Sequence, residues 1–103
     1  MAETVLLTGA SGFVGRAIHA ALLAQGVVVE PVGRGARAGW HRADLLVAAD
    51  RARLVEGTRA KVLVHAAWYV AHGSFWASPL NEAWRVASVD LARRFLAAGG
   101  RRI

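Results

Sequence analysis

The spacing of hydrophobic and polar residues changes several times along the chain. Short apolar runs alternate with stretches in which apolar residues recur every three or four positions, the period of a helix packed on one face. We expect strands at Thr4–Thr8, Val27–Val32, Trp40–Arg42 and Val62–Ala66, with the first step of a fifth strand at 101–103. We expect helices at Phe13–Gln25, Ala48–Val55 and Pro79–Ala98. This alternation predicts a parallel sheet with helices on both faces.

The apolar positions of each expected helix predict the face that packs inward. In the first helix they are Phe13, Val14, Ala17, Ile18, Ala21 and Leu22. In the second they are Ala48, Ala52 and Val55, and in the third Leu80, Ala83, Trp84, Ala87, Leu91 and Phe95. Pro31 lacks an N–H group, which weakens the prediction for the C-terminal half of the second strand. Right-handed crossovers give the strand order 3-2-1-4 and a crevice beside the first strand, where the order reverses.

Three glycines connect the first strand to the first helix with the spacing Gly-x-x-Gly-x-x-Gly. Such a turn can hold a diphosphate, because the unpaired amides and the dipole of a helix N-terminus attract an anion. Gly9 would make the tight turn, Gly12 would let the backbone approach a pyrophosphate, and Gly15 would allow close packing of helix on strand. Ser11 and Phe13 belong to the same predicted site. The alternative is a purely structural turn, since this spacing can arise by chance in a chain with eleven glycines.

If the diphosphate belongs to a nicotinamide dinucleotide, the residues after the second strand indicate whether that cofactor is NADP or NAD. An acid usually stands there in NAD-binding domains and bonds the ribose hydroxyls, whereas a nearby arginine accommodates the 2′-phosphate of NADP. Here the position is Gly33, followed by Arg34 and, a little later, Arg37. The two arginines favour NADP as the cofactor. Glu30 is the alternative: it would favour NAD if it reached the ribose, but as a strand residue it can instead face solvent.

The stretch Thr8–Gly15, read as Thr-Gly-Ala-Ser-Gly-Phe-Val-Gly, resembles the start of the extended short-chain dehydrogenases/reductases. Specifically, it is similar to the NAD-dependent epimerase/dehydratase family, which acts on nucleotide sugars. The resemblance implies a Rossmann-type doubly wound α/β fold, of which this chain has about four strands. Asp44 followed by Leu45 resembles the family's Asp-Leu pair after the third strand, whose carboxylate bonds the adenine amino group. The equal alternative is an aspartate that simply precedes a helix.

The end of the fourth strand extends the resemblance. Residues 64–67, Val-His-Ala-Ala, are similar to the family's His-x-Ala strand ending, which lines the cofactor beside the glycine turn. The resemblance therefore implies that Ala66 and Ala67 pack on the cofactor. We expect His65 to contribute packing and backbone positioning rather than proton transfer. Ser88 stands where the family typically has a structural asparagine, which is a local departure from the pattern.

Aromatic residues gather after the fourth strand, where the resembled family borders its substrate crevice. Their faces could stack on a base or a sugar ring, or they could fill a core or cover a partner domain. The two interpretations are balanced for Trp68, Tyr69, Phe75 and Trp76. For Trp84, inside a helix, the core is favoured.

The catalytic pair of the resembled family, Tyr-x-x-x-Lys, is absent from the sequence. The chain has one tyrosine, Tyr69, which Gly73 follows four residues later, and its only lysine is Lys61. We therefore expect residues 1–103 to be the N-terminal NAD(P)-binding portion of a nucleotide-sugar epimerase, dehydratase or reductase, ending where the fifth strand starts. Such an enzyme moves a hydride between nicotinamide and a sugar or a related alcohol or ketone. The alternative is a non-catalytic NAD(P)-sensing or regulatory module.

The composition of the chain limits the classes of partner and the cellular compartment that we expect. The net charge is +6, but the arginines are scattered and form no contiguous basic stripe with aromatics, so we expect no nucleic-acid partner. Without cysteine there is neither a disulfide framework nor a thiolate metal site. The uncharged residues 62–81 contain two histidines and other polar residues, which argues against a membrane span. We expect a cytoplasmic protein, whose full-length form would bind a dinucleotide and a nucleotide-sugar-like substrate and could form a homodimer.

Overall fold

The computed structural model describes residues 3–68 and 79–103 of the 103-residue chain. In chain order it contains β1 (Thr4–Thr8), α1 (Phe13–Ala24), β2 (Val28–Gly33), β3 (His41–Arg42), α2 (Ala48–Gly57), β4 (Val62–His65) and α3 (Leu80–Ala97). The three expected helices and the first four expected strands are present, with bounds that differ by at most two residues at either end, whereas the expected start of a fifth strand forms only an isolated bridge. Three residues of the predicted aromatic cluster lie outside the described residues: Tyr69, Phe75 and Trp76.

The four strands of the described residues form a parallel sheet in the order β3-β2-β1-β4, which confirms the predicted topology. Within it, Val5 of β1 lies opposite Val29 of β2 and Val62 of β4. Beyond β4, Arg102 forms an isolated parallel bridge with Val62, and the Leu63 N–H donates to the Arg102 carbonyl at 2.9 Å. The residues expected to begin a fifth strand therefore lie beside β4.

Pro31 does not interrupt β2, because its nitrogen faces the edge of the strand along which β3 has not yet begun. The Val28 N–H donates to the Glu3 carbonyl at 2.9 Å, so this residue directs its backbone groups toward β1. Neighbouring residues of a strand direct these groups to opposite edges, which turns Pro31 toward β3. β3 pairs with Val32 and Gly33 and begins only after Pro31. The proline therefore removes no ladder hydrogen bond.

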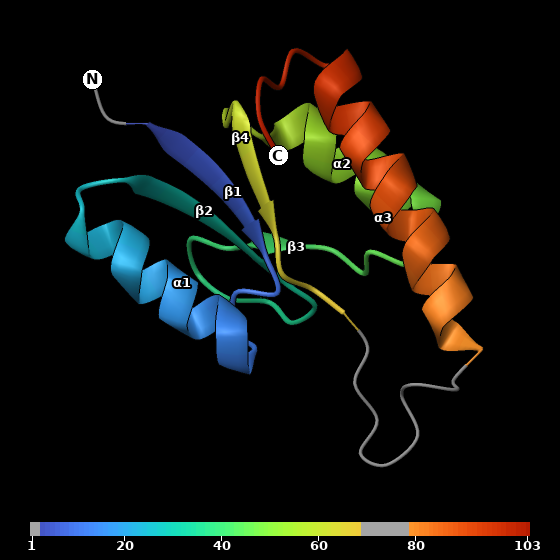
Figure 1. The fold of residues 1–103 in the computed structure, drawn as a ribbon, viewed down its shortest axis with the longest axis horizontal. Coiled ribbons are helices and arrows are strands. Elements are labelled where there is room, and N and C mark those ends of the chain that lie inside the picture. Colours follow the sequence, from blue (N-terminus) through green and yellow to red (C-terminus); the bar gives the residue numbers. More distant parts are fainter. Residues whose placement is uncertain (1–2, 69–78) are drawn as a thin grey trace.

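Figure 1 shows α1 on one side of the sheet and α2 and α3 on the other, the doubly wound arrangement that the sequence predicted. The main core lies between the sheet, α2 and α3. It consists of Leu6, Val32, Ala43, Leu45, Leu54, Val55, Ala60, Leu63, Leu91 and Phe95. The carboxyl ends of β1 and β4 lie at the same edge of the molecule as the first turns of α1 and α3 (Figure 1). This edge is where the crevice was expected.

α1 buries less of its apolar surface than its sequence pattern predicted. Gly15 is buried, and Ile18 and Leu22 are half-buried. These residues share one narrow line on the helix, at spacings of three and four, and α1 contacts β1 and β2 along it. The prediction was wrong for the remaining side chains, which are exposed: Phe13 (88%), Val14 (59%), Ala17 and Ala21. Among the described residues, no helix is long and apolar enough to cross a membrane.

The buried face of α2 also differs from the predicted one. It consists of Arg51, Leu54 and Val55, whereas Ala48 is exposed and Ala52 is half-buried. The buried face therefore includes the charged residue Arg51, where the sequence pattern had predicted Ala52. The reason is tertiary, because the Arg51 guanidinium finds its partners outside its own helix.

α3 follows its predicted pattern except in its first turn. Its buried residues are Ala87, Leu91 and Phe95, and Trp84 is half-buried against the core. Leu80 and Ala83 were predicted to face inward, but both are exposed. The start of α3 borders an open cavity at the carboxyl edge of the sheet, so it has less of the sheet to pack against.

Candidate functional site

The turn between β1 and α1 brings the backbone of Gly9 against the end of β4. Gly9 has a φ of 66°, a left-handed conformation that favours glycine. A Cβ atom here would lie 2.7 Å from backbone atoms of Ala66 and Ala67, so no side chain fits. The Gly12 N–H donates to the Gly9 carbonyl at 3.0 Å and closes the turn. The fold itself therefore requires glycine at position 9.

The other two glycines of the motif differ in what a side chain would meet. A Cβ atom at Gly15 would overlap the Gly9 carbonyl, so glycine is needed for α1 to approach the turn. At Gly12 the backbone is extended, with φ −77° and ψ 175°, and a Cβ atom would meet only the Gly9 carbonyl oxygen, at 3.3 Å. A side chain at Gly12 would therefore need the Gly9 carbonyl to shift by a few tenths of an ångström, a smaller conflict than at Gly9 or Gly15.

The N-terminus of α1 is suited to an anion. The first N–H groups of a helix have no partner within the helix. Within the described chain, no side chain caps this end, and the first turn of α1 contains no acidic residue. The helix dipole adds a partial positive charge at the same place. A phosphate group in front of Gly12 and Phe13 would therefore meet N–H donors and no opposing charge from the helix.

A cavity of about 970 Å³ opens in front of this turn, at the carboxyl edge of the sheet. It is lined by residues that the sequence had predicted for the site: Gly9, Ser11, Gly12, Phe13, Gly15, Arg34, Ala66, Ala67 and Trp68. These residues come from the ends of β1, β2 and β4 and from the start of α1. The topology therefore brings together nearly all of the predicted site that the structure describes.

The cavity also has lining residues that were not predicted as site residues: Val14, Val32, Gly33, Ala43, Leu45, Leu46, Leu80 and Trp84. Most of them are neighbours of predicted site residues in the sequence. They could have been predicted as well, because the ends of parallel strands converge at a switch point. For Trp84 the sequence had left a place at the crevice as the less favoured alternative to the core, and Leu80 lies one helical turn before it.

Asp44 lies just outside this cavity and lines a second one that includes Arg34. Asp44 Oδ1 accepts the Leu46 N–H at 3.1 Å, and the Asp44 N–H donates to Asp50 Oδ2 at 2.8 Å. These bonds hold the loop between β3 and α2, so Asp44 has the structural role that was the alternative to an adenine contact. The adenine contact stays a prediction.

Three polar side chains connect β1, β4 and α3 beneath the cavity. Thr8 Oγ1 accepts the N–H groups of Ala66 and Ala67 at 3.1 and 3.3 Å and lies 2.6 Å from His65 Nδ1. His65 Nε2 lies 2.8 Å from Ser88 Oγ. Burial lowers the pKa of His65, which favours the neutral ring. This arrangement supports a positioning role for His65.

Trp68 and Trp84 line the cavity on the side of α3. The Trp68 and Trp84 rings are stacked, with centroids 6.0 Å apart and planes inclined by 29°. The Trp68 Nε1–H donates to Asn81 Oδ1 at 3.1 Å. Trp84 packs against the core and lines the cavity, so both interpretations of this residue hold in part.

Glu30 is engaged away from both cavities. Its Oε1 accepts hydrogen bonds from Thr58 Oγ1 and His41 Nε2, each at 2.7 Å, and its Oε2 accepts the Arg59 N–H at 3.2 Å. Although burial acts to raise the pKa of Glu30, these hydrogen bonds hold it below its usual value. The carboxylate therefore has a full set of partners within the fold.

The two arginines after β2 have different positions. Arg34 lines both cavities. Arg37 lines neither of them, and its guanidinium carbon lies 4.3 Å from the centroid of the Trp40 ring, in a cation–π contact. Of the two arginines that suggested NADP, only Arg34 is therefore at the candidate site.

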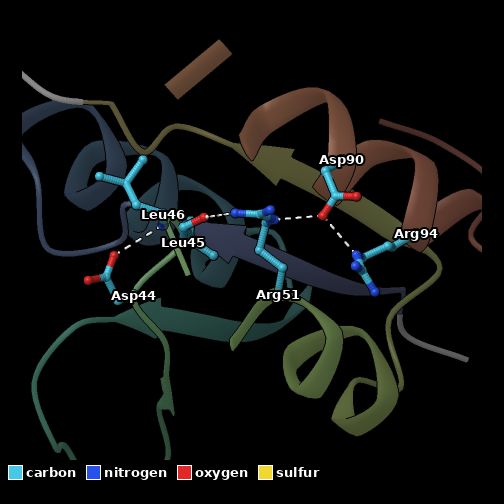
Figure 2. A network of polar contacts seen from close by, with 6 residues as sticks. All are labelled: Asp44, Leu45, Leu46, Arg51, Asp90 and Arg94. Atoms are coloured by element: carbon cyan, nitrogen blue, oxygen red, sulfur yellow. Dashed lines mark hydrogen bonds and ion pairs between the residues drawn. The ribbon is translucent and has the colours of Figure 1, made fainter. Parts of the chain in front are cut away.

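Arg51, which was not singled out in the sequence, fixes the loop that forms one wall of the site. Its side chain is buried; Nη1 donates to the Leu45 carbonyl and Nε to Asp90 Oδ2, each at 2.7 Å. Arg94 Nε donates to the same Asp90 oxygen at 2.7 Å. Figure 2 shows Arg51 reaching between the Leu45 carbonyl and the Asp90 carboxylate on α3. Bonds from Arg51 and Arg94 lower the pKa of Asp90 and keep it charged.

Three solved structures illustrate what the fold is similar to. UDP-glucose 4-epimerase from Thermus thermophilus, in complex with NAD, is 24% identical with a TM-score of 0.79, over 95% of this chain and 35% of that chain. A short-chain dehydrogenase/reductase superfamily protein from Agrobacterium tumefaciens, with bound NAD, is 24% identical with a TM-score of 0.72, over 97% and 31%. A nucleoside-diphosphate sugar epimerase from Corynebacterium glutamicum is 33% identical with a TM-score of 0.62, over 94% and 19%.

The chain thus spans roughly a third or less of the length of these proteins. A comparison with curated protein sequences finds no match. The family model of the NAD dependent epimerase/dehydratase family matches residues 5–102, which is nearly the whole chain. The glycine turn, the strand order and this match agree, and the chain belongs to the NAD dependent epimerase/dehydratase family.

Proposed function

We propose that the chain binds a nicotinamide dinucleotide across the carboxyl edge of its sheet. The observation that carries this proposal is the space in front of Gly12. Gly12 leaves the backbone bare where it lines a cavity beside an uncapped helix N-terminus, and the surrounding chain opposes a side chain there less than at Gly9 or Gly15. The Thermus thermophilus and Agrobacterium tumefaciens structures contain NAD, which supports the same ligand here.

The residues present fit such a cofactor. The pyrophosphate would be held by the turn residues Gly9, Ser11, Gly12, Phe13 and Gly15. Asp44 would take the adenine, and Ala66 and Ala67 would pack on the cofactor, where their small side chains leave the cavity open. When bound, the nicotinamide would supply or accept a hydride.

We further propose that NADP is preferred over NAD. Gly33 offers no carboxylate to the ribose, and Glu30, the acid that could have served, has three partners elsewhere. Arg34 lines the cavity and can donate a charged hydrogen bond to a 2′-phosphate, worth about 1.5–3 kcal/mol. Charge complementarity therefore favours the phosphorylated cofactor.

For the whole protein we propose hydride transfer to or from a nucleotide sugar or a related alcohol or ketone. The UDP-glucose and nucleoside-diphosphate sugar epimerases among the similar structures support this substrate class. Trp68 would border the substrate side, with Tyr69 and Trp76, which lie outside the described residues. The chain contains no Tyr-x-x-x-Lys pair, so residues 1–103, as the cofactor-binding portion, would bind nucleotide without turning it over.

A second candidate is a non-catalytic NAD(P)-sensing module, which would need no Tyr-x-x-x-Lys pair. Both candidates bind the dinucleotide, and they differ in whether a Tyr-x-x-x-Lys pair is supplied by the same polypeptide. A reading frame that continues past Ile103 into such a pair would support the enzyme. A stop directly after Ile103 would favour the sensor.

Titration of the purified chain with NADPH and NADH, followed by tryptophan fluorescence, tests the proposal. Trp68 and Trp84 line the cavity, so an occupied site should change the emission. Saturable binding with NADPH preferred is the expected result. Preference for NADH would contradict the NADP assignment, and a linear response to both would contradict dinucleotide binding by this chain.

A further inference from the structure

A second cavity, of about 490 Å³, adjoins the proposed dinucleotide cavity, and Arg34 lines both. Its other lining residues are Arg42, Asp44, Asp50 and Arg53. Three guanidinium groups face two carboxylates, which leaves an excess of positive charge. The planar fork of a guanidinium matches the oxygens of a phosphate group.

Arg42 and Arg53 come from different elements and meet through a backbone contact. Arg42 ends β3, where it lies opposite Gly33, the residue before Arg34. Arg53 belongs to α2; its Nη2 donates to the Arg42 carbonyl at 3.1 Å and its Nη1 to Asp50 Oδ1 at 3.0 Å. These bonds use two of the five N–H donors that a guanidinium carries. Donors therefore remain for a ligand.

The carboxylates of this cavity are already used within the loop. Asp50 Oδ2 accepts the Asp44 N–H, and Asp50 Oδ1 accepts the Arg53 bond. In that order of importance, these bonds lower the pKa of Asp50 and keep it charged. Asp44 Oδ1 accepts the Leu46 N–H. The two acids thus shape the loop and orient one arginine, while Arg34 and Arg42 also line the cavity.

We propose that Arg42 and Arg53, together with Arg34, form a subsite for the 2′-phosphate of NADP. The inference rests on the proposed function, in which the dinucleotide fills the adjoining cavity. A phosphate here would accept hydrogen bonds from three separate segments of the chain. The 2′-hydroxyl of NAD would supply no charge to them. Arg37, which the sequence had paired with Arg34, is stacked on Trp40 instead and lines neither cavity.

The test compares NADPH and NADH affinities of the purified chain with those of Arg42→Gln, Arg53→Gln and Arg59→Gln. Arg59 is an exposed arginine just after α2 that lines neither cavity, so its variant carries the same charge change. Binding of 2′,5′-ADP and of 5′-ADP, measured alongside, separates the 2′-phosphate from the nicotinamide half. Denaturant unfolding of each variant checks that the fold is retained.

We expect Arg42→Gln and Arg53→Gln each to weaken NADPH and 2′,5′-ADP about tenfold or more. NADH and 5′-ADP should bind as before, and Arg59→Gln should behave as the wild-type chain. If Arg42→Gln and Arg53→Gln bind NADPH as Arg59→Gln does, the subsite is wrong, although dinucleotide binding stands.

Two further outcomes would also overturn the inference. If Arg53→Gln weakens both dinucleotides equally, Arg53 supports the loop rather than the phosphate, and the subsite of three arginines is wrong. If the wild-type chain binds neither dinucleotide, the proposed function fails and the subsite with it.

Discussion

Thr8 Oγ1 lies 2.6 Å from His65 Nδ1, and this contact defines the tautomer of a histidine beneath the cavity. The Thr8 oxygen already accepts the N–H groups of Ala66 and Ala67, so its own hydrogen is donated to Nδ1. A neutral His65 therefore carries its proton on Nε2 and donates it to Ser88 Oγ at 2.8 Å. The pair connects the strand before the glycine turn to the strand ending that packs against Gly9.

Thr8→Val should destabilise the chain by about 1–3 kcal/mol, because the isosteric change removes the acceptor of the Ala67 N–H, one of two acceptors of the Ala66 N–H, and the contact with His65 Nδ1. Thr8 is completely buried, so water cannot replace the hydroxyl. Denaturant unfolding measures the change. Thr4→Val, at the half-buried start of the same strand, is the matched control and should change the free energy of unfolding by less than about 0.5 kcal/mol. Equal effects of the two substitutions would show that the Thr8 hydroxyl has no special role.

His65 should make the stability of the chain depend on mildly acidic pH. Burial places its folded pKa below the usual value of 6.5, so the unfolded chain binds more protons as the pH falls. Its contribution is complete above the unfolded pKa and is lost as the pH falls through the folded pKa. We expect the free energy of unfolding to decrease from about pH 7 to about pH 5. The decrease should be smaller in His65→Gln, and parallel pH profiles for the two proteins would refute this origin.

Arg51→Met should destabilise the chain and disturb the wall of the cavity. The substitution leaves the Leu45 carbonyl without its donor and Asp90 with only Arg94 as a partner, at a cost of about 1–3 kcal/mol. Glu82→Gln breaks an exposed ion pair on α3 and should have no measurable effect. Thermal unfolding of both variants checks the difference. Wild-type stability in Arg51→Met would mean that this buried guanidinium is dispensable.

The strand order and the glycine turn could be predicted from sequence because they rest on local signals. The spacing of the three glycines indicates the turn at Gly9. The handedness of the crossovers then determines which strands are neighbours. The position of the cavity follows from the same rule, since strand ends at a switch point converge. Ala66 and Ala67 were predicted by a different route, through the resemblance of their strand ending to that of the family.

Long-range partners explain what the sequence could not predict. Nothing in the local sequence marks Arg51 as buried, because Asp90, which neutralises it, is 39 positions away. Arg53 reached the candidate site only because α2 packs beside the end of β3. The exposure of Phe13 has the opposite cause: α1 is apolar around much of its circumference but meets the sheet along one line.

The most direct test of the central claim is the NADPH affinity of Gly12→Ala. Within the chain the added methyl group would meet only the Gly9 carbonyl oxygen, at 3.3 Å, whereas it would obstruct a pyrophosphate bound at the turn. We expect cooperative unfolding within about 1 kcal/mol of the wild-type chain, together with NADPH binding weakened at least about tenfold. Gly57→Ala, where an added Cβ atom meets nothing within 4 Å, should bind as the wild-type chain does. A Gly12→Ala chain that binds NADPH with unchanged affinity would contradict a cofactor held at the glycine turn.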